Sequence, residues 1–172
     1  MVIAILTTIT VISYQNVMKQ SYNAQISAGV RSYYDAIKAY KLAKGTYPST
    51  TKEENGEHIA MTCVGTGYED GYCGKVTGVD VYEDALFNTQ IKSFLKTNTG
   101  PISDIWLPVP GESYVGAAYG IDTTIKSSTG YGRVIEYAMH GENVDCGVAA
   151  AWAYSTTPEA TACEILLEEI SF

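Results

Sequence analysis

The sequence lacks charged residues over its first eighteen positions, and no Lys or Arg precedes Lys19. A secretory signal peptide begins with a basic region and ends at a small-residue cleavage site, so this segment does not follow that pattern. The apolar run ends at about Val17, at or below the roughly 17–25 residues that cross a bilayer. Hydroxyl side chains dilute it further, at Thr7, Thr8, Thr10 and Ser13. Of three interpretations, a cleaved signal, a membrane anchor and the buried end of a helix that packs against copies of itself, the pattern argues against the first, and the short run looks like the remainder of a longer helix.

The sequence also lacks the motifs that mark common catalytic and metal sites. It has no P-loop, no GxGxxG, no HExxH and no EF-hand spacing. The two histidines, His58 and His140, lie in no recognisable catalytic motif, and the acids near glycines at residues 65–71 fit a plain turn better than a calcium loop. We therefore expect no enzymatic activity, no cofactor and no metal site.

Cysteine is scarce, with four residues, and no two of them have the C-x-x-C spacing of a zinc site. Four cysteines allow three disulfide connectivities. We expect adjacent pairing, Cys63 with Cys73 and Cys146 with Cys163, because each pair closes a short, turn-rich segment. An even cysteine count suits an oxidising compartment outside the cytoplasm.

Positive charge becomes rare after residue 44. Up to that point the chain has five basic residues and one acidic residue, whereas the remainder has six basic and eighteen acidic residues. The total of −8 therefore divides into +4 for the first part and −12 for the second. An acidic surface repels phosphate backbones, so we expect the globular part not to bind nucleic acid directly.

A helical pattern runs without a break from the apolar start to about Lys44. Apolar and aromatic side chains recur every three or four residues on one side, at Tyr22, Ile26, Val30, Tyr33, Ile37 and Tyr40. We expect this side to pack on a sheet. Gly45 can adopt the left-handed cap and Pro48 prevents continuation, so the helix is predicted to stop at Gly45.

The remaining residues indicate one globular domain of ordinary size. Residues 49–81 are predicted to form a long, cysteine-closed connection with a strand-like run at 58–64, followed by a short helix at 82–96. Strand-like runs at 112–121 and 132–140 form a plausible antiparallel hairpin, and a last strand is expected at 162–168.

These elements predict an α+β fold in which a long N-terminal helix packs on a small antiparallel β-sheet, with the helices on one face. We divide the chain into residues 1–22, the apolar half of the helix, which forms a filament core or a membrane segment, and residues 23–172, a globular domain that includes the amphipathic half.

Three stretches carry a resemblance to a known family. The first is the helix and its continuation into Gly-x-Tyr-Pro, residues 2–25 and 39–50. The second is the cysteine-bracketed loop MTCVGTGYEDGYCGK at 61–75. The third joins RVIEYAMHGENVDCGV at 133–148 to TACEILL at 161–167. Together they cover well over half of the chain, which resembles the type IV pilins, the structural subunits of retractable surface filaments.

The resemblance implies the pilin "lollipop" fold, with a disulfide-closed αβ loop and a C-terminal disulfide loop. It implies an extracellular pilus (fimbrium) subunit that serves adhesion, twitching motility or DNA uptake and resides in the cytoplasmic membrane before assembly. The implied partners are identical subunits in a helical homopolymer, the pilus assembly machinery with minor pilins, and an unknown surface or host-cell receptor.

The resemblance also implies that the apolar half of the helix packs with identical helices in a filament core. The residues available for this packing are Val2, Ile3, Ile5, Leu6, Ile9, Val11, Ile12 and Val17. β-Branched and hydroxyl side chains weaken a helix. Our hypothesis is that the segment containing Thr7, Thr8, Thr10 and Ser13 becomes extended in the fibre while it stays helical in a monomer.

Pilins of this kind begin with a processed Phe or similar residue, followed within a few positions by a glutamate that this sequence does not have. We therefore expect the first turns of the helix to precede Met1, and we assign no residue a role in processing or methylation. Two alternatives stay open: a pseudopilin or minor pilin of a type II secretion or competence system, and, from another class, a membrane-anchored extracytoplasmic binding domain or enzyme that works as a monomer.

Overall fold

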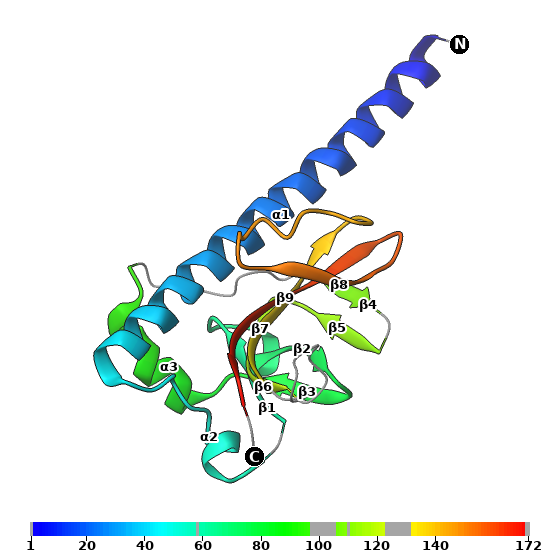
Figure 1. Ribbon diagram of the computed structural model, residues 1–172. Coiled ribbons are helices and arrows are strands. Elements are labelled where there is room, and N and C mark those ends of the chain that lie inside the picture. The colour runs from blue at the N-terminus through cyan, green and yellow to red at the C-terminus, as the bar shows by residue number, and fades with distance from the viewer. Residues whose placement is uncertain (1, 58, 97–105, 110, 123–131, 171–172) are drawn as a thin grey trace.

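The computed structural model describes residues 2–57, 59–96, 106–109, 111–122 and 132–170, and it describes the side chains of the first helix from residue 16 onward. The helices are α1 (Val2–Lys44), α2 (Thr51–Glu54) and α3 (Ala85–Ile91), with short 3₁₀ turns at Glu69–Gly71 and Lys92–Phe94. Figure 1 shows α1 as a single rod, of which the first half projects away from the rest of the molecule.

The helix α1 ends where its sequence predicts. Gly45 adopts a φ of 79°, in the left-handed region that glycine enters without steric cost, and its N–H donates to the Lys41 carbonyl at 2.8 Å. Five of the six side chains expected on the packing side are buried, and Tyr40 is half-buried. The amphipathic half of α1 is therefore fixed on the globular domain through that side.

The strands form two antiparallel sheets. The large sheet has the order β1-β6-β7-β9-β8, formed by Ala60–Val64, Ala117–Asp122, Gly132–His140, Ala160–Glu169 and Trp152–Thr156. The small sheet has the order β3-β2-β5-β4, formed by Val79–Tyr82, Tyr72–Val76, Glu112–Tyr114 and Leu107–Val109. The central strand of the large sheet is thus β7.

Successive side chains of β7 point to opposite faces of the large sheet. Met139 faces α1, where its sulfur lies 3.9 Å from Ser27 Oγ. Glu136 faces the small sheet, where its Oε2 lies 2.9 Å from the hydroxyl oxygen of Tyr114 on β5. The helix and the small sheet therefore cover opposite faces, which explains why β7 is buried from Gly132 to Met139.

The helix α3 lies on the same face as α1. Phe87 of α3 stacks on Tyr119 of β6, with ring centroids 4.7 Å apart, and Tyr119 is paired with Ile135 on the face of β7 that also carries Met139. The Tyr119 hydroxyl donates to the Pro48 carbonyl at 2.6 Å. This bond ties the segment after α1 to the large sheet.

Both disulfides follow the adjacent pairing, which is thereby confirmed. Cys63 of β1 is bonded to Cys73 of β2, so this bridge joins the large sheet to the small one. Cys146, in the loop that follows β7, is bonded to Cys163 of β9. The second bridge holds that loop against the large sheet.

The α+β class with a long N-terminal helix and antiparallel sheets is confirmed, whereas the expectation of one small sheet is wrong. The predicted strand at 112–121 divides at Val115 and Gly116 into β5 and β6, which belong to different sheets. The expected loop at 49–81 also contains β2 and β3. These strands are short, and pairing across the chain stabilises them more than their local pattern does.

The second helix is shorter than predicted. Tyr82 ends β3, and α3 begins after Asp84, whose Oδ1 accepts hydrogen bonds from the N–H groups of Leu86 and Phe87 at 2.8 and 3.0 Å. Burial raises the pKa of Asp84. The hydrogen bonds that its carboxylate accepts from Phe87, Thr51 and Leu86 lower the pKa by more than burial raises it, so the net pKa lies below 3.8. The capping carboxylate sets the start of the helix.

Candidate functional site

The projecting half of α1 is the first candidate site. All described side chains from Asn16 to Ser21 are exposed, including Val17 at 61% and Met18 at 47%. Among the described side chains of the helix, Tyr22 is the first buried one. Exposed apolar side chains such as Val17 and Met18 on a projecting helix are typical of an interaction surface.

The side chains predicted to form a filament core lie outside the described residues, except for Val17. Those outside are Val2, Ile3, Ile5, Leu6, Ile9, Val11 and Ile12, and the proposed melting residues Thr7, Thr8, Thr10 and Ser13 lie outside as well. The backbone is helical through this whole segment. The structure therefore places these residues on one continuous helix that runs into the domain.

The helix leaves the domain at a cluster of contacts that we call the helix exit: Tyr22, Asn23, Ser27 and Arg31 against the large sheet and the C-terminal disulfide loop. The Asn23 side chain donates to the His140 carbonyl at 3.0 Å and accepts from the His140 N–H at 2.7 Å. The Tyr22 hydroxyl donates to the Ala138 carbonyl at 3.3 Å. The side-chain amide thus completes the hydrogen bonding of β7 at its last residue.

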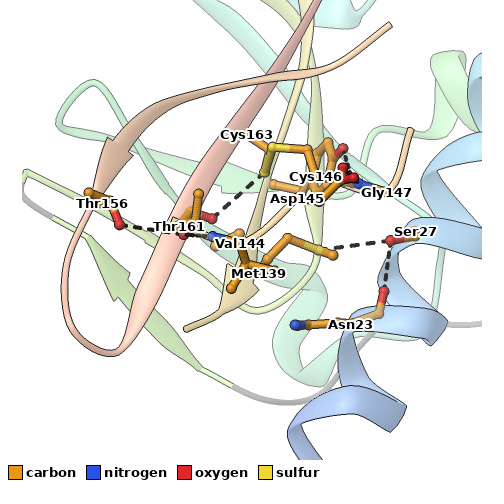
Figure 2. The surroundings of a disulfide bond; sticks show 12 residues. Asn23, Ser27, Met139, Val144, Asp145, Cys146, Gly147, Thr156, Thr161 and Cys163 are labelled. Atoms are coloured by element: carbon orange, nitrogen blue, oxygen red, sulfur yellow. Dashed lines mark hydrogen bonds between the residues drawn. A yellow bond between two sulfur atoms is a disulfide. The ribbon is translucent and has the colours of Figure 1, made fainter. Parts of the chain in front are cut away.

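The C-terminal disulfide loop forms the other side of the helix exit, as Figure 2 shows. A Cβ added to Gly147 would lie 2.3 Å from Ser27 Oγ, so only glycine allows the loop to approach the helix this closely. Arg31 Nη2 donates to the Gly147 carbonyl at 2.8 Å. The Tyr137 hydroxyl donates to the Cys146 carbonyl at 2.8 Å, which fixes the loop from the sheet side.

His140 is the imidazole at the helix exit, and it packs edge-on against Tyr22 with ring centroids 4.7 Å apart. Burial lowers the pKa of His140 below its ordinary value of 6.5, the nearby Lys19 lowers it further, and a hydrogen bond with the backbone of Glu159 raises it in part. The imidazole is therefore neutral at pH 7. The contact of His140 with Tyr22 indicates that His140 packs the helix exit.

The end of α1 is fixed by a second cluster. Arg133 of β7 donates to both carboxylate oxygens of Glu53, at 2.6 and 2.9 Å. Burial lowers the pKa of Arg133. The hydrogen bonds to Glu53 and the neighbouring Tyr119 raise the pKa by more than burial lowers it, so the net pKa lies above its ordinary value. Lys41 of α1 lies 3.9 Å from the centroid of the Tyr47 ring, and the Tyr47 hydroxyl donates to the Leu167 carbonyl.

An exposed aromatic row beside the first disulfide is a feature that the sequence did not reveal. The Tyr72 ring lies 5.4 Å from the Tyr82 ring and 6.3 Å from the Trp106 ring. Tyr82 and Trp106 are 49% and 51% exposed. The three residues are far apart in the sequence, and only the pairing of β2 with β3 and the return of the chain before β4 bring them together.

No group of three His, Cys, Asp or Glu side chains within the described ranges is arranged to hold a metal ion. In the same part of the chain, no helix combines the length and the hydropathy of a membrane span. His58 lies outside the described residues. Comparison of the chain with protein-family models, with curated proteins and with solved structures finds no match.

Proposed function

We propose that this chain is a type IV pilin, a subunit that polymerises through its N-terminal helix into a cell-surface filament. One observation carries the proposal: α1 extends beyond Tyr22, its first buried side chain among those described, as a helix that projects from the domain (Figure 1) and whose sequence is apolar. A helix in this position becomes stable in water only when another apolar surface covers it. Copies of the same helix supply that surface.

The helix exit supports this function because it fixes the direction in which the helix leaves the domain. Hydrogen bonds from Asn23 and Tyr22 to β7, and the close approach of Gly147 to Ser27, leave one orientation for the rod. A subunit repeated through a heterologous contact that does not close forms a helical fibre. A fixed angle between rod and domain is what a regular fibre requires.

The energy available for assembly is large. Burial of one Leu, Ile or Val side chain contributes roughly 1.5–3 kcal/mol. Eight such residues are available along the projecting half, from Val2 to Val17. Before assembly, we propose that the same helix resides in the cytoplasmic membrane, with the acidic domain outside.

The finer assignments belong to the same proposal. We assign the "lollipop" fold of pilins to the rod and the domain, and adhesion, surface motility or DNA uptake to the filament. The exposed aromatic row of Tyr72, Tyr82 and Trp106 is a suitable adhesive contact with a surface or host-cell receptor, because it adjoins a disulfide-closed loop at the surface.

The test compares Ile5→Asp and Ile9→Asp with Ile5→Leu as the matched control, in cells that produce the chain. A carboxylate in a packed helical core is uncompensated, so we expect the aspartate variants to form no filaments while their domains stay folded. Electron microscopy of sheared surface material and circular dichroism of the purified full chain measure the two results. We expect Ile5→Leu to assemble normally.

Normal filaments in either aspartate variant would contradict core packing by the projecting helix. Mass spectrometry of the intact subunit determines its N-terminus in the same preparation. A major pilin dominates the sheared material, whereas a pseudopilin or minor pilin is a small component of it. A wild-type chain found only as a detergent-solubilised monomer would favour the membrane-anchored binding domain.

A further inference from the structure

A cluster of acidic and phenolic side chains is buried between the two sheets. Glu136 of the central strand β7 is 1% exposed, and its Oε2 lies 2.9 Å from the hydroxyl of Tyr114 on β5. The Tyr114 hydroxyl also lies 2.9 Å from Glu112 Oε2 and 2.8 Å from the Tyr154 hydroxyl of β8. Tyr154 in turn contacts Glu112 Oε2. Four oxygen atoms from three strands are thus connected by four close contacts, three of which involve the Tyr114 hydroxyl.

The number of protons in this cluster does not match the number of contacts. The two phenolic hydroxyls supply two protons, whereas the four oxygens make four close contacts. With both carboxylates ionised, Tyr114 donates to only one of Glu112 and Glu136, and the other carboxylate faces a phenolic oxygen without a hydrogen between them. A third proton supplies a hydrogen to each of the three contacts that involve a carboxylate, and leaves only the contact between Tyr114 and Tyr154 without one.

Glu136 is the carboxyl group that is best placed to hold the third proton. A protonated Glu136 donates to Tyr114 Oη, Tyr114 then donates to Glu112, and Tyr154 also donates to Glu112. Glu112 is half-buried, whereas Glu136 is fully buried. No donor reaches the remaining Glu136 oxygen, Oε1, and the Asp122 carboxyl lies within hydrogen-bond reach of Glu136, so an ionised carboxylate would be poorly solvated there.

The other groups that face Glu136 add negative charge. Asp122 of β6 contributes a carboxyl group, which contacts the Thr77 hydroxyl at 3.1 Å in the turn between β2 and β3. Glu164 of β9 is paired directly with Glu136 in register and is also buried. The strand β4, which packs against β7 and β9, contributes the buried apolar side chains Leu107 and Val109. The helix α1 covers the opposite face of the large sheet. None of the ion pairs between described residues includes Glu112 or Glu136.

We propose that Glu136 is a proton-binding site, which keeps its proton in the folded domain and donates it to Tyr114, so that the packing of the small sheet on the large one depends on pH. The site is independent of filament assembly and of the N-terminal helix.

Burial and the neighbouring Asp122 carboxyl both raise the pKa of Glu136 well above its ordinary value of 4.5. Burial likewise raises the pKa values of Tyr114 and Tyr154, so both phenols remain donors. Because the folded pKa of Glu136 is the higher one, its contribution to stability is complete below about pH 4.5 and is lost as the pH rises through the folded pKa.

The test is the pH dependence of unfolding of the full chain in a non-ionic detergent. For one retained proton, the unfolding equilibrium constant rises about tenfold per pH unit between the unfolded and folded pKa values of Glu136. We expect Glu136→Gln to remove this slope above about pH 4.5, because its amide donates to Tyr114 without titrating. The matched control Glu57→Gln, at an exposed position, is expected to keep the wild-type slope.

Equal slopes for the wild type and Glu136→Gln would overturn the proposal. If Glu136→Gln does not fold, carbon-13 NMR of the wild-type glutamate carboxyl groups decides the question. We expect one glutamate carboxyl to remain protonated after the others have titrated near about pH 4.3, the ordinary value for this side chain. Ordinary titration of every glutamate would reject the site.

Discussion

A methyl group added at Gly147 tests how closely the C-terminal disulfide loop packs on α1 at the helix exit. It has a φ of 71°, and a Cβ there would lie 2.3 Å from Ser27 Oγ and 3.0 Å from Ser27 Cβ. We expect Gly147→Ala to destabilise the domain by about 1–3 kcal/mol, because the loop or the helix must move. Urea unfolding followed by circular dichroism measures the change.

The matched control for Gly147→Ala is Gly56→Ala, which has a similar φ of 78° but no atom within 4 Å of the added carbon. It measures the cost of backbone strain alone. We expect the added change Ser27→Gly to recover part of the stability of Gly147→Ala. Equal losses in Gly147→Ala and Gly56→Ala would mean that the clash with α1 has no effect.

Residue patterns with a local period were predictable, and residues that act through distant partners were not. The packing side of α1, from Tyr22 to Ile37, follows from the helical period. Asn23 has no local signal, because its role depends on the backbone of His140, 117 positions away. Glu136 sits in a strand whose burial on both faces depends on the second sheet, so its sequence context gives no indication of a buried carboxyl group.

The two disulfides act on different pairs of elements. Their sequence separations of 10 and 17 residues predict similar stabilisation, about 2–4 kcal/mol each. We expect Cys63→Ala with Cys73→Ala to loosen β2 and β3, because that bridge joins the two sheets. We expect Cys146→Ala with Cys163→Ala to loosen α1 near the helix exit.

Amide hydrogen exchange of the full chain distinguishes these two effects. Each double variant serves as the control for the other, because the lost stability is similar while the loosened element differs. Faster exchange in α1 between residues 22 and 31 is expected only when the bridge from Cys146 to Cys163 is absent. Unchanged exchange there would contradict the role of this loop in holding the helix.

Among the elements, α1 and its end were predictable from the helical period and from Gly45 and Pro48. The positions of the short strands depend on pairing with strands that are distant in the sequence. The turn between β2 and β3 places Thr77 at a φ of 52° before Gly78, so the hairpin has no common turn dipeptide to reveal it. β8 is an exposed edge strand with one bulge and lacks a clear alternating pattern. The division of the predicted strand at 112–121 depends on the first disulfide and on the hydrogen bond from Val115 to Cys73.

In the whole molecule, one part of α1 packs on the globular domain and the other part projects from it. Digestion with trypsin can distinguish the two parts. Lys19 lies on the exposed part, whereas Arg31 and Lys38 lie on the part that packs on the sheet. Local opening costs little where few contacts hold a segment. We expect cleavage after Lys19 to be more than about tenfold faster than cleavage after Arg31 or Lys38 in the detergent-free chain.

Mass spectrometry of the digest identifies the cuts, and Arg31 and Lys38 are controls within the same helix. The expected product is a folded fragment that begins at Gln20. Similar rates at all three sites would show that the amphipathic half is held no better than the projecting half. In filaments, the proposed packing predicts that Lys19 becomes protected.

The helix exit also determines how the domain would carry mechanical load. Tyr22 and Asn23 bond to Ala138 and His140, both on β7, which has two strands on each side of it in the large sheet. Tension applied along the rod therefore enters the sheet at its middle strand, where both neighbours share it, and not at an edge strand that could peel away. The hydrogen bond from Arg31 to Gly147, followed by the bridge from Cys146 to Cys163, offers a second route for the same tension into β9.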